Sequence, residues 1–321
     1  VQLSLMTKDR FKSSGIYDEL QDKIIRVMDF KGNDAGTSAR KAINTFVKLG
    51  FIEPYLRSYH ELCRKFLSEH DKEEKRIIFS KIFYQNSSLC SSVTEDNRGP
   101  SHIKFFLTTL DRNKHLNADD IKALMITDIT RYPEGYLTKS QLEQKRRLVE
   151  ANGFEERKYN QISHLKSFLK NFVDIKYISD NDCFYFADDP DVVNKDEIEN
   201  LTRDPIRYRI FRDELKAESR RLFNGVVCFV EKRPYKGLVA SQIKPSHICI
   251  KEGVEDEAYD VNNGLLLSKN IDQYFNDFDI TFDEDGYIVI GKRVHPAIAE
   301  LFRGKHLDGN ILNDERQKYL D

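Results

Sequence analysis

The sequence of 321 residues has no tryptophan, three methionines and five cysteines. The cysteines are odd in number and scattered, and no two of them form a Cys-x-x-Cys pair. A disulfide framework has an even number of cysteines, and a structural zinc site has them at close, regular spacings. We therefore expect neither of them. We expect reduced, mainly buried thiols at Cys63, Cys90, Cys183, Cys228 and Cys249.

Long apolar runs are also missing. No window approaches the roughly 18 consecutive apolar residues that a membrane-spanning helix needs. The first residues, Val1 to Lys8, do not have the charged and then apolar layout of a signal peptide. Both observations predict a globular protein that makes no membrane contact and is located in the cytoplasm.

Several common catalytic patterns do not occur. The sequence contains no glycine-rich phosphate loop, no Ser-His-Asp arrangement and no dinucleotide fingerprint. The formal net charge is only −2, which argues against a nonspecific nucleic-acid coat, because such proteins are basic overall. Arginine and lysine nevertheless outnumber acidic residues between Arg203 and Lys236, just after an acidic stretch at 188–199. This basic segment is either an approach surface for DNA or a solvated charged helix.

The residues that are present predict several domains of mixed structure. With 40% hydrophobic residues, a chain of this length can form two or three cores. Helical periodicity dominates the first half, and strand-like segments appear in the last third. We expect an α+β protein with a helical module at 1–100, a second module at 101–189, an acidic linker at 190–203 and a mixed domain at 204–321.

Both helical modules resemble winged-helix domains. In the first module, the helix that ends at Gly50 and continues as Phe51 and Ile52 looks like a third helix followed by a wing strand. In the second, a helix from Lys158 to Phe172 precedes short strands at 173–178 and 183–187. The resemblance implies that this helix lies in the major groove, where side chains contact bases or phosphates; the candidates are Lys158, Asn160, Gln161, His164 and Lys166. The alternative is that the modules are structural or bind protein.

The mixed domain contains the most specific pattern of the chain, between Gly237 and Phe282. An apolar strand ends in Ala-Ser-Gln-Ile-Lys-Pro at 240–245, a loop leads to Asn-Gly-Leu-Leu-Leu at 263–267, and a short helix follows. This run resembles the HNH (ββα-metal) nuclease family, whose strand usually ends in Ala-Ser-His-Ile-x-Pro. The family's histidine is replaced by Gln242. The alternative is an ordinary β-hairpin and helix in which these residues only form a core.

The resemblance implies a role for each matching residue. Asn263 would brace the catalytic loop, Asp272 would bind a divalent metal together with Ser241, and Gln242 would occupy the position of the base. Lys244 would contact DNA. Magnesium, or another divalent cation such as manganese, is the expected cofactor, because magnesium needs only one or two protein carboxylates. His247 is an alternative base, although Pro245 turns the chain between it and Gln242.

From this pattern we expect a sequence-specific DNA endonuclease of the type II restriction class, acting on double-stranded DNA. A homodimer is expected because cleavage of both strands of a palindrome needs two sites related by a two-fold axis. Cleavage is expected to be impaired or lost through Gln242. The alternatives are a noncatalytic DNA-binding regulator that keeps the HNH fold and a protein-interaction scaffold.

Overall fold

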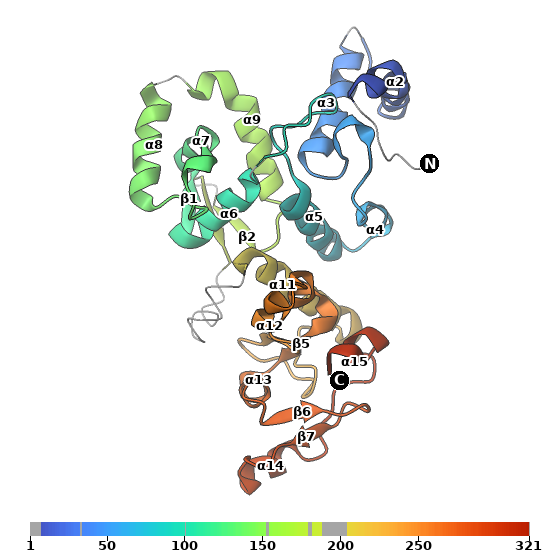
Figure 1. Cartoon of the computed structure of the whole chain (residues 1–321), viewed down its shortest axis with the longest axis vertical. Coiled ribbons are helices and arrows are strands. Elements are labelled where there is room, and N and C mark those ends of the chain that lie inside the picture. The colour runs from blue at the N-terminus through green and yellow to red at the C-terminus, as the bar shows by residue number, and fades with distance from the viewer. Residues whose placement is uncertain are drawn as a thin grey trace. The chain divides into compact units, whose positions relative to one another are not determined.

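A computed structural model describes residues 8–32, 34–99, 101–151, 154–178, 182–187 and 204–320, without the side chains of 154–161 and 178. Contacts divide the chain into two compact units, Val1–Phe186 and Ala187–Asp321 (Figure 1). Each unit is described by itself. The acidic linker expected at 190–203 lies outside the described residues. Within them, no helix is both long and apolar enough to cross a membrane.

Unit 1 is mainly helical. Its N-terminal half contains α1 (Lys8–Ser13), α2 (Ile16–Val27), α3 (Ala35–Lys48), η1 (Pro54–Leu56), α4 (Cys63–Ser68) and α5 (Lys72–Asn86). Its second half contains α6 (His102–Asn113), β1 (His115–Asn117), α7 (Ala118–Met125), η2 (Ile129–Arg131), α8 (Lys139–Ala151), α9 (Phe154–Leu169), β2 (Ile175–Ile178) and β3 (Cys183–Phe186).

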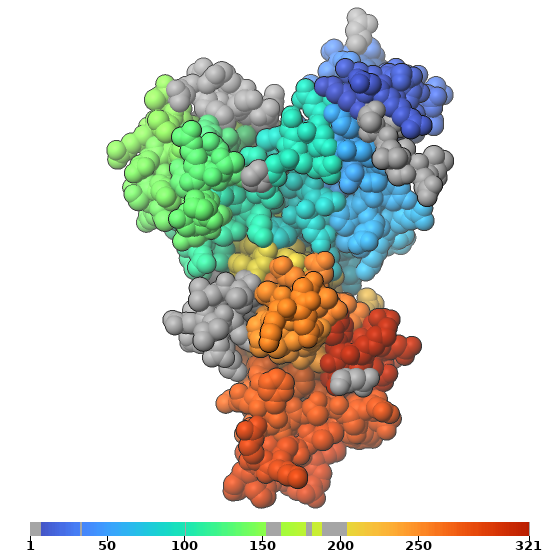
Figure 2. Space-filling model, in the orientation of Figure 1, coloured from blue at the N-terminus to red at the C-terminus, as the bar shows by residue number. Residues whose placement is uncertain are grey.

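Helix α5 joins the two halves of unit 1. Seven of its 15 residues are buried, so it is a core helix rather than a surface helix with one apolar face. Arg76 donates to the carbonyl of Phe172 at 2.8 Å, and Ser80 accepts from the amide of Val173 at 2.9 Å. The contact-based unit Val1–Phe186 therefore spans both of the modules expected at 1–100 and 101–189. In Figure 2 the cyan and teal residues of unit 1 lie between its blue and its green residues.

The second half of unit 1 contains a three-stranded antiparallel sheet in the order β1-β3-β2. Strands β2 and β3 lie at the residues that the sequence indicates, whereas β1 is an addition. A capping box fixes the start of α7, because Asn117 accepts from the amide of Asp120 and the Asp120 carboxylate accepts from the amide of Asn117. Helices beside a small sheet are compatible with the winged-helix hypothesis for this half.

The first half of unit 1 differs from expectation. The segment directly after α3 forms an isolated bridge between Ile52 and Tyr59, and residues 8–99 as described contain no β-strand. Gly50 explains the abrupt turn: its φ is +86°, and an added Cβ would lie 2.6 Å from the carbonyl carbon of Asn86. Close packing against the end of α5, rather than a wing, follows α3.

The first described helix of unit 2 is α11 (Pro205–Phe223), which is capped by Asp204 and has Pro205 at its first position, a start that the Asp-Pro pair in the sequence predicts. The other elements are β4 (Val239–Gln242), α12 (Ser246–Lys251), η4 (Glu255–Tyr259), η5 (Val261–Asn263), β5 (Gly264–Leu267), α13 (Lys269–Asn276), β6 (Ile280–Phe282), β7 (Ile288–Ile290), α14 (Pro296–Phe302) and α15 (Asp314–Leu320).

The core of unit 2 surrounds β5, all four residues of which are buried. Strand β4 pairs antiparallel with β5, and β6 pairs with β7. The apolar run at 226–231 and the short turn after it predict a strand that pairs with 237–243, and this prediction is wrong. Residues 226–231 form no strand, and Phe229 instead donates its amide to the carbonyl of Leu266 at 2.8 Å. Lys232 has a φ of +53°, so the chain turns before a ladder can extend.

Candidate functional site

The β4–β5 hairpin places the two halves of the motif opposite each other. Ser241 faces Leu265 across the ladder and Gln242 faces Gly264. The glycine after Asn263 is needed because α11 packs directly on this strand: a Cβ on Gly264 would lie 2.5 Å from the ring of Phe211. The motif's glycine thus lets α11 approach the hairpin closely.

Asn263 holds the chain that leaves β4. Its side chain is fully buried. Its Oδ1 accepts from the amide of Lys244 at 2.7 Å, and its Nδ2 donates to the carbonyls of Lys244 and Glu257, both at 2.9 Å. One carboxamide therefore fixes residues 244 and 257, which are 13 positions apart. This geometry suits the bracing role that the resemblance implies.

Gln242 and Lys244 both contact the segment that precedes Asn263. The Gln242 amide donates to the carbonyl of Ala258 in η4. The Lys244 ammonium lies 2.8 Å from a carboxylate oxygen of Glu252 and 2.7 Å from one of Glu257, and these two hydrogen bonds raise the pKa of Lys244. The carboxylates of Glu252 and Glu257 therefore balance the positive charge of Lys244, which the sequence proposes as a DNA contact. The alternative base, His247, is exposed on α12.

Ser241 and Asp272 meet in a separate, buried network. The Ser241 hydroxyl donates to Oδ1 of Asp272 at 2.8 Å, and Nδ2 of Asn276 donates to the same oxygen at 3.1 Å. Ser241 is 2% exposed and Asp272 is 1% exposed. Asn276 was not selected from the sequence. Its position four residues after Asp272 on one helix could have indicated this contact, because residues four apart are neighbours on a helix surface.

The two parts of the motif lie on different faces of the hairpin. Successive side chains of a strand point to opposite faces, so Ser241 contacts α13 whereas Gln242 contacts η4. The structure therefore brings Gln242 and Asn263 together around η4, and it brings Ser241 of β4 and Asp272 of α13 together on the other face. It does not place all four side chains in one pocket.

These residues do not fit a catalytic magnesium or manganese ion. Magnesium in proteins keeps several waters and binds substrate phosphate, so its ligands must reach solvent. Asp272 does not, and its Oδ1 already accepts hydrogen bonds from the Ser241 hydroxyl and the Asn276 amide. Within residues 8–320 as described, no group of three or more His, Cys, Asp or Glu side chains could hold a metal.

The proposed DNA-reading residues lie on α9 in unit 1. Lys158, Asn160 and Gln161 belong to this helix, but their side chains are outside the described residues. His164 is exposed and stacks on Phe168, with ring centroids 6.2 Å apart. The Lys166 ammonium forms an ion pair with Asp182.

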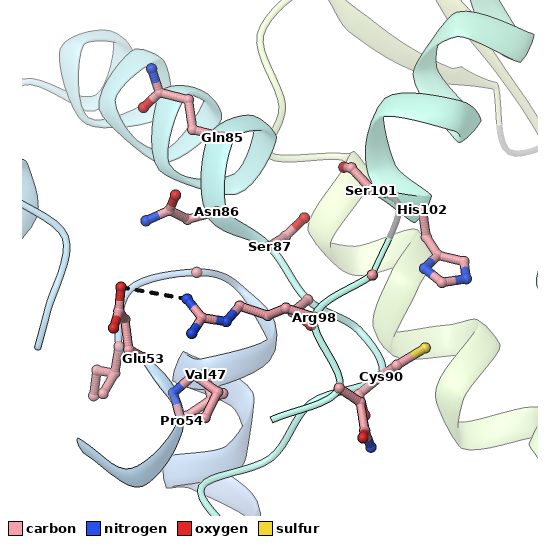
Figure 3. Close-up of a pocket in the computed structure, with 15 residues that line it drawn as sticks. Val47, Glu53, Pro54, Gln85, Asn86, Ser87, Cys90, Arg98, Ser101 and His102 are labelled. Carbon is pink, nitrogen blue, oxygen red and sulfur yellow. Dashed lines mark hydrogen bonds and ion pairs between the residues drawn. The ribbon is translucent and has the colours of Figure 1, made fainter. Parts of the chain in front are cut away.

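A cavity of about 160 Å³ opens in unit 1, and none of the predicted site residues lines it (Figure 3). Its lining includes Glu53, Asn86, Arg98 and His102. Arg98 lies across it, 3.6 Å from Glu53, and donates twice to Asp96 at 2.8 Å. Since its cation is already paired with carboxylates, the cavity offers no open anion site at this arginine.

Comparison with known proteins identifies one segment of the chain. Residues 226–283 match the family model HNH_2, described as an HNH endonuclease. The matched residues include β4, β5 and α13, and hence the whole motif. No curated protein matches the chain in sequence. The match supports an HNH-type domain in unit 2 and indicates nuclease activity on DNA for this domain type.

Proposed function

We propose that the chain is a DNA endonuclease of the type II restriction class in which phosphodiester cleavage is impaired. The match at residues 226–283 supports the nuclease type, and the observation that carries the proposal is the contact of Gln242. Its side chain occupies the position of the family's histidine and donates a hydrogen bond to Ala258 instead of facing solvent as a base. Double-stranded DNA is the proposed substrate.

The chemical reason for impairment is the lack of basicity at position 242. Hydrolysis of a phosphodiester needs a water that loses its proton as it attacks. Neutral histidine accepts such a proton near pH 7, whereas the glutamine amide does not. Loss of a general base lowers the rate by about 10²- to 10⁴-fold. Gln242 retains only the ability to orient a group by hydrogen bonding.

Target selection is assigned to unit 1. In this proposal its second half is a winged-helix module and α9 lies in the major groove, with His164 exposed for contact with a base. Two copies of the chain bind a palindromic site as a homodimer, which gives each strand its own HNH domain. Sequence specificity, the groove assignment and the dimer are parts of the proposal.

A second candidate is a noncatalytic DNA-binding regulator. The burial of Asp272 and Ser241 favours it, because a solvent-inaccessible carboxylate cannot serve a hydrated cation and a phosphate. In such a regulator the network between Ser241 and α13 holds the hairpin to the helix and contributes nothing to chemistry. The two candidates share DNA binding and differ only in whether any cleavage can be recovered.

The test combines binding and cleavage. A gel-shift series across salt concentrations with a random DNA library measures affinity and selects a preferred sequence. Cleavage of the selected duplex is then measured with Mg²⁺ for the Gln242→His variant, with Gln273→His as control, because Gln273 is exposed on α13. A gain above about 100-fold for Gln242→His alone supports the endonuclease.

Other outcomes reject one or both candidates. Unchanged binding without any gain in cleavage rejects the impaired endonuclease and leaves the regulator. No salt-dependent affinity for duplex DNA rejects both candidates and favours a protein-interaction scaffold.

A further inference from the structure

The C-terminal end of unit 2 contacts the loop that leads into Asn263. Three side chains from residues 313–319 reach three consecutive loop residues. Asn313 Nδ2 donates to Asn262 Oδ1 at 3.0 Å, Arg316 Nη2 donates to the carbonyl of Val261 at 2.9 Å, and the Tyr319 hydroxyl donates to Asp260 Oδ2 at 3.2 Å. The HNH match ends at residue 283, so these contacts come from outside it.

Arg316 fixes this end of the chain to the rest of the unit. Its side chain is fully buried. Two of its nitrogens donate to the two carboxylate oxygens of Glu218 in α11, at 3.1 and 2.9 Å, and Nη1 also donates to the carbonyl of Ile311 at 2.7 Å. A paired guanidinium with this many fixed partners has one orientation. Its remaining bond therefore holds Val261 at a defined place relative to α11.

The loop passes this constraint to Asn263. Asp260 accepts from the amide of Asn262 through Oδ1 at 2.9 Å, and its carbonyl accepts from the amide of Asn263 at 2.9 Å. The Asn263 carboxamide then holds both backbone groups of Lys244. A continuous series of hydrogen bonds thus runs from α15 to the residue two positions after Gln242.

We propose that Asn313, Arg316 and Tyr319 are positioning residues for Asn263. They hold the loop 260–262 so that the carboxamide of Asn263 meets Lys244 and keeps the end of β4 in one conformation. The functional part of the HNH-type domain then extends beyond the matched residues to Tyr319. Only the consequence for DNA binding rests on the proposed function, because the positioning itself is a property of the free protein.

The test uses two substitutions that leave the Arg316 pair intact. In the native chain the backbone amide of Arg316 donates to Oδ1 of Asn313 at 2.8 Å. Asn313→Asp keeps an oxygen that accepts this bond, but it removes the NH₂ group that donates to Asn262. Tyr319→Phe removes only the hydroxyl on Asp260. Gln317→Glu is the matched control, since Gln317 is on the same helix and donates to the carbonyl of Glu284 at 3.2 Å, away from the loop.

The readout is residue-resolved hydrogen exchange in the full chain without DNA. In the double variant Asn313→Asp/Tyr319→Phe we expect the protection of the Lys244 amide to fall by about tenfold, the amount that one or two lost hydrogen bonds produce. The amides of Leu266 and Leu267 should keep their protection, as should every site in the control. A purely structural role would lower protection throughout unit 2.

Either of two results overturns the inference: unchanged protection at Lys244, or an equal loss across unit 2. DNA affinity is measured separately on the same variants. If Lys244 loses protection and no variant or parent binds DNA, the positioning role stands and the proposed function fails. If the parent binds DNA and the exchange pattern of the variants does not change, the positioning role fails and DNA binding by the chain stands.

Discussion

Replacing Arg316 by methionine is the most informative single test of what holds unit 2 together. The side chain has no exposed surface and makes four hydrogen bonds, two of them to Glu218. Methionine fills much of the volume but leaves the carboxylate of Glu218 without its partner. Glu218 is only 8% exposed, so water cannot readily replace the arginine. Breaking a buried pair from one side costs about 3–5 kcal/mol, most of it the penalty for the stranded charge.

The comparison variants separate charge from packing. Glu218→Leu/Arg316→Met removes both charges, and we expect it to recover most of the lost stability, because a buried pair is often replaceable by apolar groups of similar volume. Lys318→Met is the surface control. Its ion pair with Glu315 spans 2.7 Å between side chains that are each 65% exposed, so its loss should cost at most about 1 kcal/mol.

The assay is urea unfolding followed by peptide-resolved hydrogen exchange, so that the stability of unit 2 is measured separately from that of unit 1. The expected order of stability is parent and Lys318→Met highest, then the double variant, then Arg316→Met. A loss below about 1 kcal/mol for Arg316→Met would refute the reasoning, since it would mean that Glu218 is solvated or finds another partner. A double variant as unstable as the single one would show that the contacts to Val261 and Ile311 carry the stability.

Two further predictions concern unit 1. Gly50→Ala should destabilise the protein by more than Gly135→Ala: both sites have positive φ, at a cost of about 1–2 kcal/mol for alanine, but only at Gly50 does the new Cβ meet backbone, at Asn86. Equal losses in urea unfolding would contradict the close-packing argument. Hydrogen bonds from Arg98, opposed by burial, lower the pKa of Asp96 to about 2. Because this folded-state pKa lies below the unfolded value of about 3.9, the ionised carboxylate stabilises the fold above pH 4 and loses this effect as the pH falls towards 2. The stability difference between parent and Asp96→Asn should shrink over that window in acid unfolding, and a constant difference would refute it.

Local signals in the sequence predicted local structure well. Asp204 and Pro205 mark the start of α11, and the polar residues around 180 separate the two strands that become β2 and β3. These signals depend on neighbours within a few residues, so the sequence displays them directly. The α+β class follows in the same way, since helical and strand periodicities occur in separate segments.

Long-range pairings were not predictable in this way. The ladder between β4 and β5 joins residues about 25 positions apart, and the interpretation that used the nearer segment at 226–231 failed because Lys232 turns the chain too early. The Ser241–Asp272 bond spans 31 positions and the Arg316–Glu218 pair spans 98. Residue type shows that each side chain can form such a bond, whereas burial and partner depend on the whole fold.

Position 242 therefore cannot be considered alone. Cleavage by an HNH-type domain needs both a base and a cation held against the phosphate. Gln242→His supplies the base on the η4 face of the hairpin. Asp272 belongs to α13, on the other face, and its Oδ1 accepts hydrogen bonds from Ser241 and Asn276. If cleavage nevertheless returns with the single substitution, the cation must bind elsewhere or α13 must move to expose Asp272. Adding Asp272→Asn to Gln242→His distinguishes these cases: continued cleavage places the cation at other ligands, and its loss shows that Asp272 becomes accessible when DNA binds.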